Sequence, residues 1–290
     1  MLGVLARGLS RIVLISLLAG LIGSVFVRLG PGFGVSAEDL DPRLSDATRA
    51  EIQRRNSAGK DVAAYYGQWL CGLAHGDLGF SPSLKRPVTD LLRERAGVTA
   101  TEVAAGGAAG IAAGFLLAVV ILACPRAVAS LLCGLGSSLA LSLPAAVIAL
   151  ICLWLDANPL WAVAAAVTPH ALQYLTGVLS ASAMSDHVLA ARARGLGRSR
   201  ILFRHVLTPV AGELAAVAGM AVSIALGASI PIEAICSRAG IGQLVWQAAL
   251  ARDLPVLVNV TVLLAIVTIG ANTLTDMVIA ARNPVRGSLP

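Results

Sequence analysis

Long apolar runs separated by polar stretches dominate the chain. The six runs cover residues 12–27, 98–123, 128–155, 160–183, 211–232 and 255–280. A helix rises about 1.5 Å per residue, so crossing a bilayer core takes about 20 residues, and every run after the first exceeds this length. The first run is shorter, but Arg11 and Arg28 at its ends can extend to the lipid headgroups. We therefore predict an all-α membrane protein with six transmembrane helices.

The polar stretches divide the chain into four parts. We expect an N-terminal transmembrane helix in 1–29, an external segment in 30–97, a transmembrane domain in 98–281 and a cytoplasmic tail in 282–290. A cleaved signal peptide is the alternative for the first part. No small-x-small cleavage site follows its apolar run, and Arg28 lies where one would be expected, so a retained helix is favoured.

Composition supports a bilayer environment. Hydrophobic residues make up 57% of the chain and charged residues only 13%, which is about half the charged share of soluble domains. Aromatic residues contribute 4%, so the apolar runs consist mainly of small and aliphatic residues that allow close helix packing. The net charge of +6 does not indicate nucleic acid, because the basic residues form no single stripe and no binding motif. The five cysteines show no C-x-x-C spacing, which disfavours a metal or redox motif.

Basic residues predict the orientation, because short cytoplasmic loops carry an excess of Lys and Arg. With the N-terminus inside, the cytoplasmic parts hold Arg7, Arg11, Arg126, Arg192, Arg194, Arg198, Arg200, Arg204, Arg282 and Arg286. The short external loops hold Arg238 and Arg252, with Arg28 at the edge of the long first loop, which escapes the rule through its length. Both termini are therefore expected in the cytoplasm.

Five ionisable residues lie within or near the apolar runs: Glu102, Asp156, His170, Glu213 and Asp276. A charge at the centre of a bilayer costs about 2.5–3.5 kcal/mol, so such residues usually face protein or water. Asp156 fits a solvated external turn, Asp-Ala-Asn-Pro, whereas Glu102 and Glu213 fit an interfacial or a functional role equally. His170 could relay protons, but a neutral histidine bonded to a neighbouring helix is favoured.

The polar stretch 184–209, which follows the fourth run, is the most informative loop. Residues 186–194 favour a helix whose first aspartate could cap it, and Gly195 and Gly197 are expected to interrupt it before a second helix over 199–207. Arginines there alternate with apolar side chains, a pattern typical of docking into a groove on another protein. A helix lying on anionic lipid is the alternative.

Three blocks of the sequence resemble one protein family. Ala190-Ala191-x-x-x-Gly195 resembles the end of the EAA loop of binding-protein-dependent ABC importer permeases. Its extension through Leu196, with Arg204-His205, resembles the oligopeptide, dipeptide and nickel branch. Leu189 departs from the general motif, which has a glutamate at this position.

The other two blocks resemble the B-type permease of the same branch. The stretch 66–95, which includes Gly-Asp-Leu-Gly79, is similar to its external segment, and Glu233-x-Ile-x-Ser-x-x-Gly-Ile-Gly242 is similar to its external turn. Arg252-Asp253 and Asn272-x-x-x-Asp276 follow at the family spacing. The glycines of the external turn fit either a tight return of the chain into an interface or a plain turn.

The resemblance implies a channel-forming permease subunit of an ATP-driven importer for peptides, nickel or related small solutes in the bacterial inner membrane. The implied partners are a second homologous permease, two ATPase subunits, an extracytoplasmic solute-binding protein and membrane lipid. ATP and Mg²⁺ would be held by the ATPases, and this chain would hold no cofactor. The implied ATPase-coupling residues are Leu189, Ala190, Ala191, Arg192, Arg194, Gly195, Leu196, Arg204 and His205. The external turn or gate would comprise Glu233, Gly240, Gly242, Arg252 and Asp253, and the polar residues within the spans are His170, Asn272 and Asp276.

Two other classes of protein are weighed against this one. A membrane-embedded enzyme would need a nucleophile–base pair or metal cluster, and the sequence has no Gly-x-Ser-x-Gly, His-Glu-x-x-His or paired intramembrane aspartates. A stand-alone secondary carrier would be supported by inverted repeats with broken helices, which the sequence does not display clearly. The sequence also lacks Gly-x-x-x-x-Gly-Lys-Ser/Thr, so the chain itself is not expected to bind ATP or act as an enzyme.

Overall fold

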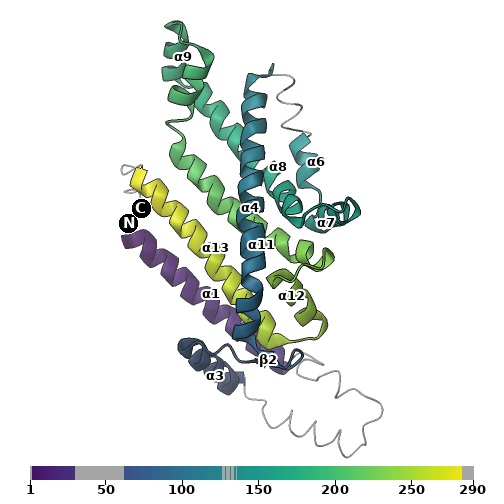
Figure 1. Ribbon diagram of the computed structural model, residues 1–290. Coiled ribbons are helices and arrows are strands. Elements are labelled where there is room, and N and C mark those ends of the chain that lie inside the picture. The colour runs from purple at the N-terminus through teal and green to yellow at the C-terminus, as the bar shows by residue number, and fades with distance from the viewer. Residues whose placement is uncertain are drawn as a thin grey trace, which may run out of the picture. The chain divides into compact units, whose positions relative to one another are not determined.

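A computed structural model describes residues 2–29, 62–125 and 136–282, together with the isolated positions 128, 131 and 134. Among these residues, five helices are long and apolar enough to cross a membrane (Figure 1): α1 (Leu2–Leu29), α4 (Val88–Ala123), α8 (Pro159–Ala183), α11 (Ala211–Ile235) and α13 (Leu254–Arg282). Long helices suit lipid because they satisfy their own backbone hydrogen bonds. The predicted all-α character therefore holds, apart from one small hairpin of β1 (Phe80–Ser81) and β2 (Arg86–Pro87).

The predicted helix over 128–155 is not continuous. Its described residues form α6 (Ser137–Leu141) and α7 (Ala145–Trp154), and Pro144 is the N-cap of α7. Proline has no N–H and its ring clashes with the carbonyl four residues earlier, so the chain breaks here. A single long helix was the wrong prediction for these residues, and the total of six crossings stays a prediction.

The other predicted spans are present with changed ends. The helices α8, α11 and α13 match the predicted runs to within three residues, whereas α4 begins at Val88 instead of residue 98. The expected turn at Asp156 is present and this residue is exposed. Asn158 caps the helix that follows by accepting from the Leu160 amide (3.0 Å), and Pro159 occupies its first turn. Part of the predicted external segment, 30–61, and the tail 283–290 lie outside the described residues.

The chain divides into two compact units. The first comprises Met1–Gly8, Thr99–Arg238 and Thr268–Pro290, and the second comprises Leu9–Val98 and Ala239–Val267. In the second unit, α3 (Val62–His75) and the hairpin lead into the start of α4, and α12 (Ile241–Leu250) leads into α13. Its buried core joins residues of these helices: Val88, Leu91, Leu92, Ile241, Leu244, Ala248, Val256 and Val260.

In the first unit, three glycines bring α4 against the backbone of α8. A Cβ added at Gly110 would lie 2.7 Å from the Val167 Cβ and 2.8 Å from the Ala164 carbonyl oxygen. Gly106 and Gly114 meet α8 in the same way, because a spacing of four residues keeps them on one helix face. This is the small-xxx-small packing typical of membrane helix pairs, and it fixes the α4–α8 pair.

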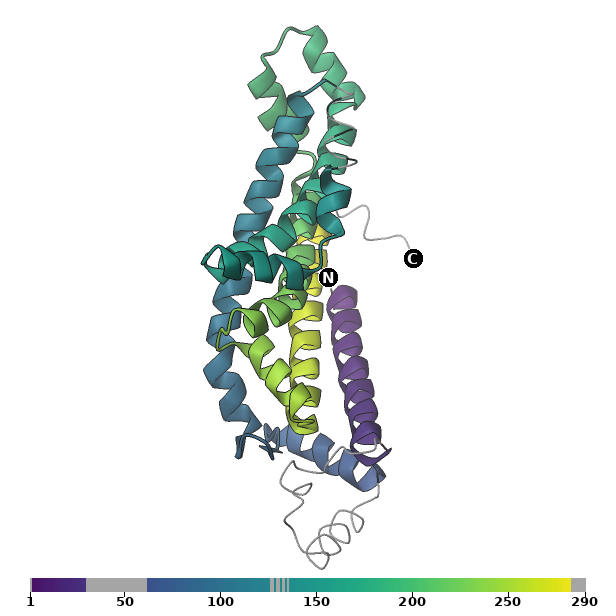
Figure 2. The ribbon, with the colours of Figure 1, turned by 90° about the vertical axis from the view of Figure 1, so that its right-hand side faces the viewer.

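The core of the first unit extends beyond the long helices. Leu175 and Leu179 of α8 are buried with Ala118 of α4 and Val217 of α11, and the same cluster includes residues between α8 and α11. Figures 1 and 2 show these short intervening helices at one end of α4 and α8. The loop that the sequence singled out is therefore packed onto the bundle.

Candidate functional site

The interhelical segment (residues 184–210) consists of three short helices. They are α9 (Asp186–Ala193), α10 (Arg198–Ile201) and the π-helix η3 (Leu202–Val206), so the predicted helix–break–helix pattern is confirmed. The predicted cap is wrong by one residue. Ser185 occupies the N-cap position, but its hydroxyl donates to the Ser182 carbonyl (2.5 Å) instead of capping α9.

Gly195 ends α9 in a left-handed conformation. Its φ is +74°, its amide donates to the Arg192 carbonyl (2.9 Å), and the Leu196 amide donates to the Ala191 carbonyl (3.4 Å). These two bonds make a Schellman motif, which satisfies carbonyls that the end of a helix leaves free. A Cβ at Gly195 or Gly197 would meet nothing within 4 Å, so conformation, not space, requires the glycine at 195.

Apolar side chains anchor the segment to the long helices. Val188 is fully buried and Val206 is 2% exposed, and Ala191 and Ile201 are also buried. All four belong to the cluster that contains Leu179 of α8. Burial of apolar surface from α9, α10 and η3 in one core makes the segment a continuation of the bundle.

Hydrogen bonds from α8 and α9 reinforce this anchoring. The Ser182 hydroxyl donates to the Val206 carbonyl (3.0 Å), and His187 Nε2 donates to the His205 carbonyl (3.0 Å). Both carbonyls lie at the end of η3, where backbone acceptors need partners outside the helix. The two side chains therefore tie η3 to the turns that precede it.

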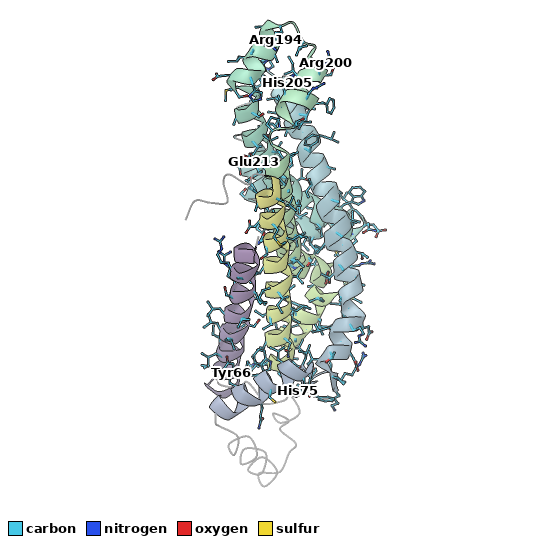
Figure 3. All side chains as sticks on the ribbon, turned by 90° about the vertical axis from the view of Figure 1, so that its left-hand side faces the viewer. Tyr66, His75, Arg194, Arg200, His205 and Glu213 are labelled. Atoms are coloured by element: carbon cyan, nitrogen blue, oxygen red, sulfur yellow. The ribbon has the colours of Figure 1, made fainter. Side chains whose placement is uncertain are left out.

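The outer surface of the segment combines arginines with large apolar side chains. Leu189 is 51% exposed and Phe203 is 66% exposed. Within the described residues of this segment, the exposed arginines are Arg192, Arg194, Arg200 and Arg204. Figure 3 shows Arg194, Arg200 and His205 at the same end of the molecule. A mixed cationic and apolar surface on a rigid support can bind an acidic, partly apolar groove.

The predicted coupling residues thus fall into two groups. Ala191 is buried, Leu196 and His205 are half-buried, and Gly195 shapes the backbone, so these residues build the segment. The others project from it: Leu189, Ala190, Arg192, Arg194 and Arg204. Sequence reasoning missed Ser182 and His187, because side chains that bond to backbone carbonyls leave no motif.

The predicted external turn is divided between the two units. Glu233 belongs to the first, and Gly240, Gly242, Arg252 and Asp253 belong to the second. The explanation by glycine flexibility does not hold for Gly240, whose φ of −105° is open to any residue. Ser237 takes the left-handed conformation in this turn, with a φ of 54°.

Asp253 holds the hairpin of the second unit. It is 3% exposed, and its Oδ2 accepts from the hydroxyls of Ser81 (2.5 Å) and Ser83 (2.6 Å). Its Oδ1 accepts from the Val256 amide (3.3 Å) in the first turn of α13. Its carboxylate is therefore satisfied within the chain, a structural arrangement that leaves little capacity for a ligand.

A buried pair of acids lies near the end of α11 in the first unit. Glu233 is fully buried and accepts from the Thr99 hydroxyl (2.7 Å), while Glu102 is 4% exposed and forms an ion pair with Arg238 (2.9 Å). These partners come from distant parts of the sequence. The local signals were an acidic residue near the start of one apolar run, Glu102, and the motif residue Glu233 just after the end of another, and each requires a partner when buried.

The predicted polar residues within the spans do not converge. His170 bonds through Nδ1 to the Ala166 carbonyl of its own helix (3.1 Å), so the expected bond to a neighbouring helix is wrong. Asn272 and Asp276 are exposed on α13, although Asn272 Oδ1 would be 3.0 Å from a Cβ at Gly219 of α11. Among the described residues, no group of three or more His, Cys, Asp or Glu side chains could hold a metal ion.

Comparisons with known proteins agree with this architecture. The family described as binding-protein-dependent transport system inner membrane component matches residues 108–284. A protein of Brucella suis named as a peptide transport system permease is 24% identical over 98% of both chains. The glutathione transport system permease of Pectobacterium atrosepticum is 26% identical over 90% of both chains. The oligopeptide transport system permease of Bacillus subtilis is 30% identical over 34% of this chain and 31% of its own length.

Proposed function

Because the chain belongs to the family of binding-protein-dependent transport system inner membrane components, we propose that it is the channel-forming permease subunit of an ATP-driven importer for peptides or similar small solutes. The observation that carries this proposal is the similarity to a peptide transport permease over 98% of both chains. The glutathione permease that covers 90% of both chains supports the same solute class, since glutathione is itself a small peptide.

The proposed partners are those of a five-part importer. A second homologous permease completes the path, two ATPase subunits bind ATP and Mg²⁺, and an extracytoplasmic protein delivers the solute. This chain is a transport subunit without its own ATPase site, which agrees with the absence of a phosphate-binding loop in its sequence. It lies in the bacterial inner membrane with both termini in the cytoplasm.

The interhelical segment (residues 184–210) is the proposed coupling element. Closure of the ATPases on ATP would move this segment, and its shared core with α8 would transmit the movement to the long helices. Transmitting this movement requires a rigid segment. The Schellman motif at Gly195 and the side-chain bonds to η3 support such rigidity. The transporter would then alternate between an outward-facing and an inward-facing state, because ATP would favour one of these states over the other.

Reconstitution tests the proposed function. The chain would be placed in proteoliposomes with its partner permease, ATPases and binding protein, and uptake of radiolabelled peptide would be measured. We expect uptake to require ATP and to stop when either the ATPases or the binding protein is omitted. Uptake by this chain alone under an ion gradient would instead identify a secondary carrier.

Site-directed crosslinking tests the coupling element separately. A photoreactive residue replacing Arg200, which is exposed on the segment, should capture an ATPase subunit. The same residue at Trp161, exposed near the start of α8, is the matched control and should capture none. Crosslinks from position 200 to lipid alone would favour a helix that lies on the membrane surface.

A further inference from the structure

Two cysteines from distant parts of the first unit lie side by side. Cys152 is in the last turn of α7, and Cys236 follows directly after α11. The Cys236 Sγ is 3.8 Å from the carbonyl oxygen of Ala149, which precedes Cys152 by one turn on the same buried face of α7. The Cys152 thiol is also among the groups that raise the pKa of Cys236, as expected for two cysteines that lie near each other. The packing of α7 against the end of α11 therefore places two free cysteines close to each other.

We propose that Cys152 and Cys236 are a redox site that forms a disulfide and locks the end of α7 to the end of α11. The predicted orientation puts both residues on the outer side of the membrane, since α7 precedes one external loop and α11 precedes another. Disulfides form and persist in such an oxidising compartment. The bond would fasten a helix that Pro144 separates from the preceding part of the chain.

The reaction needs a disulfide as oxidant. The half-buried Cys236 thiolate would attack that disulfide, form a mixed disulfide and release one thiol of the oxidant. The buried Cys152 thiolate would then attack the Cys236 sulfur and expel the second thiol. Two protons leave the two cysteines, and two electrons reduce the oxidant to a dithiol, so the exchange balances.

The environment of Cys236 should make this reaction slow at neutral pH. Burial raises the pKa of the Cys236 thiol above its usual value, Cys152 and Glu102 raise it further, and Arg238 acts in the opposite direction. Only the thiolate attacks, so the initial rate of pairing should rise about tenfold per pH unit below that pKa.

Thiol counting in native membranes tests the proposal. Cys71, Cys124 and Cys133 would be replaced by serine, and the full chain would be denatured and treated with a polyethylene glycol maleimide before or after reduction. We expect no attachment before reduction and two attachments after it. Two attachments without reductant would overturn the proposal.

A matched pair of cysteines controls for chance oxidation. A chain that keeps only Cys124 and Cys236 has thiols near opposite ends of the first unit, because Glu102, which binds Arg238, lies 22 residues before Cys124 along α4, or about 33 Å along a helix axis. Both thiols of this control should react without reductant. Mass spectrometry of the unsubstituted chain, digested with chymotrypsin, should find the peptides of Cys152 and Cys236 linked, and finding both peptides unlinked would also overturn the proposal.

Discussion

In the α4–α8 pair a glycine provides space, whereas in the interhelical segment (residues 184–210) a glycine provides a backbone conformation. At Gly110 an added Cβ would lie 2.8 Å from a carbonyl of α8. At Gly195 an added Cβ would meet nothing within 4 Å, but φ is +74°. The first requirement depends on side-chain volume, and the second depends on whether a residue tolerates the left-handed region.

We therefore expect Gly110 to contribute mainly to the stability of the fold and Gly195 mainly to coupling. Loss of space at Gly110 would push two membrane helices apart and damage the whole bundle. Loss of the left-handed turn at Gly195 would redirect the chain between α9 and α10, while the apolar anchors Val188 and Val206 keep both ends of the segment in the core. Substitutions at the two glycines should therefore have distinguishable effects on stability and on transport.

The largest effect is expected from Gly110→Leu. The backbone of α8 cannot give way to a large side chain, so we expect a loss of about 3 kcal/mol and a strongly lowered unfolding midpoint. The midpoint can be followed in detergent by circular dichroism. Gly107→Leu is the control, because a Cβ there meets nothing within 4 Å beyond its own helix. Equal loss in both variants would contradict the proposed α4–α8 contact.

A series at Gly195 should give a smaller loss of stability and a large loss of coupling. Gly195→Val puts a β-branched residue into the left-handed region, at a cost of about 1–2 kcal/mol. We expect peptide-stimulated ATP hydrolysis by the assembled complex to fall sharply, while the chain still inserts. Gly195→Asn should recover much of it, since asparagine tolerates this conformation.

The control for this series is Gly197→Val, at a position with room for a side chain and no left-handed φ. It should leave the unfolding midpoint and stimulated hydrolysis near those of the unsubstituted chain. If valine at 197 harmed coupling as much as valine at 195, the conformation of Gly195 would not be the cause.

Local patterns in the sequence were sufficient to predict some of these features. The apolar runs predicted α8, α11 and α13, and the glycine between two helix-forming stretches predicted the break at Gly195. Pro144 was visible within the run 128–155, and giving it its usual weight would have predicted the break between α6 and α7. The early start of α4 at Val88 was hidden, because polar residues precede its apolar part.

Long-range contacts could not be predicted from local patterns. Asp253 was identified as a motif residue, but its bonds to Ser81 and Ser83 join parts of the chain about 170 residues apart. The four-residue spacing of Gly106, Gly110 and Gly114 was legible, yet nothing in it specifies α8 as the partner. Such contacts depend on tertiary packing, which a single sequence does not encode in a short motif.

An intermediate effect is expected from the bonds that hold η3. Ser182→Ala removes a donor to the carbonyl of the buried Val206, and His187→Ala removes a donor to the carbonyl of the half-buried His205, so each should cost about 1 kcal/mol or less. Because the apolar anchors remain, the loss should be local. Hydrogen exchange of the amides in 202–207 should therefore accelerate while exchange in α8 stays unchanged. Ser199→Ala, at an exposed position of α10, is the control and should change neither.

The smallest effect on stability is expected from the exposed arginines. Arg194→Gln with Arg200→Gln should change the free energy of unfolding by less than about 0.5 kcal/mol, because both side chains project into solvent. The same double variant should bind the ATPases more weakly, with a shallower dependence on salt, since it removes positive charges from the proposed docking surface. Co-purification with the ATPases at low and high salt measures this. A double variant that keeps its stability but binds the ATPases weakly would differ from Gly110→Leu, which is expected to lose stability. Unchanged co-purification would contradict the proposal that the arginines of the segment bind the ATPases.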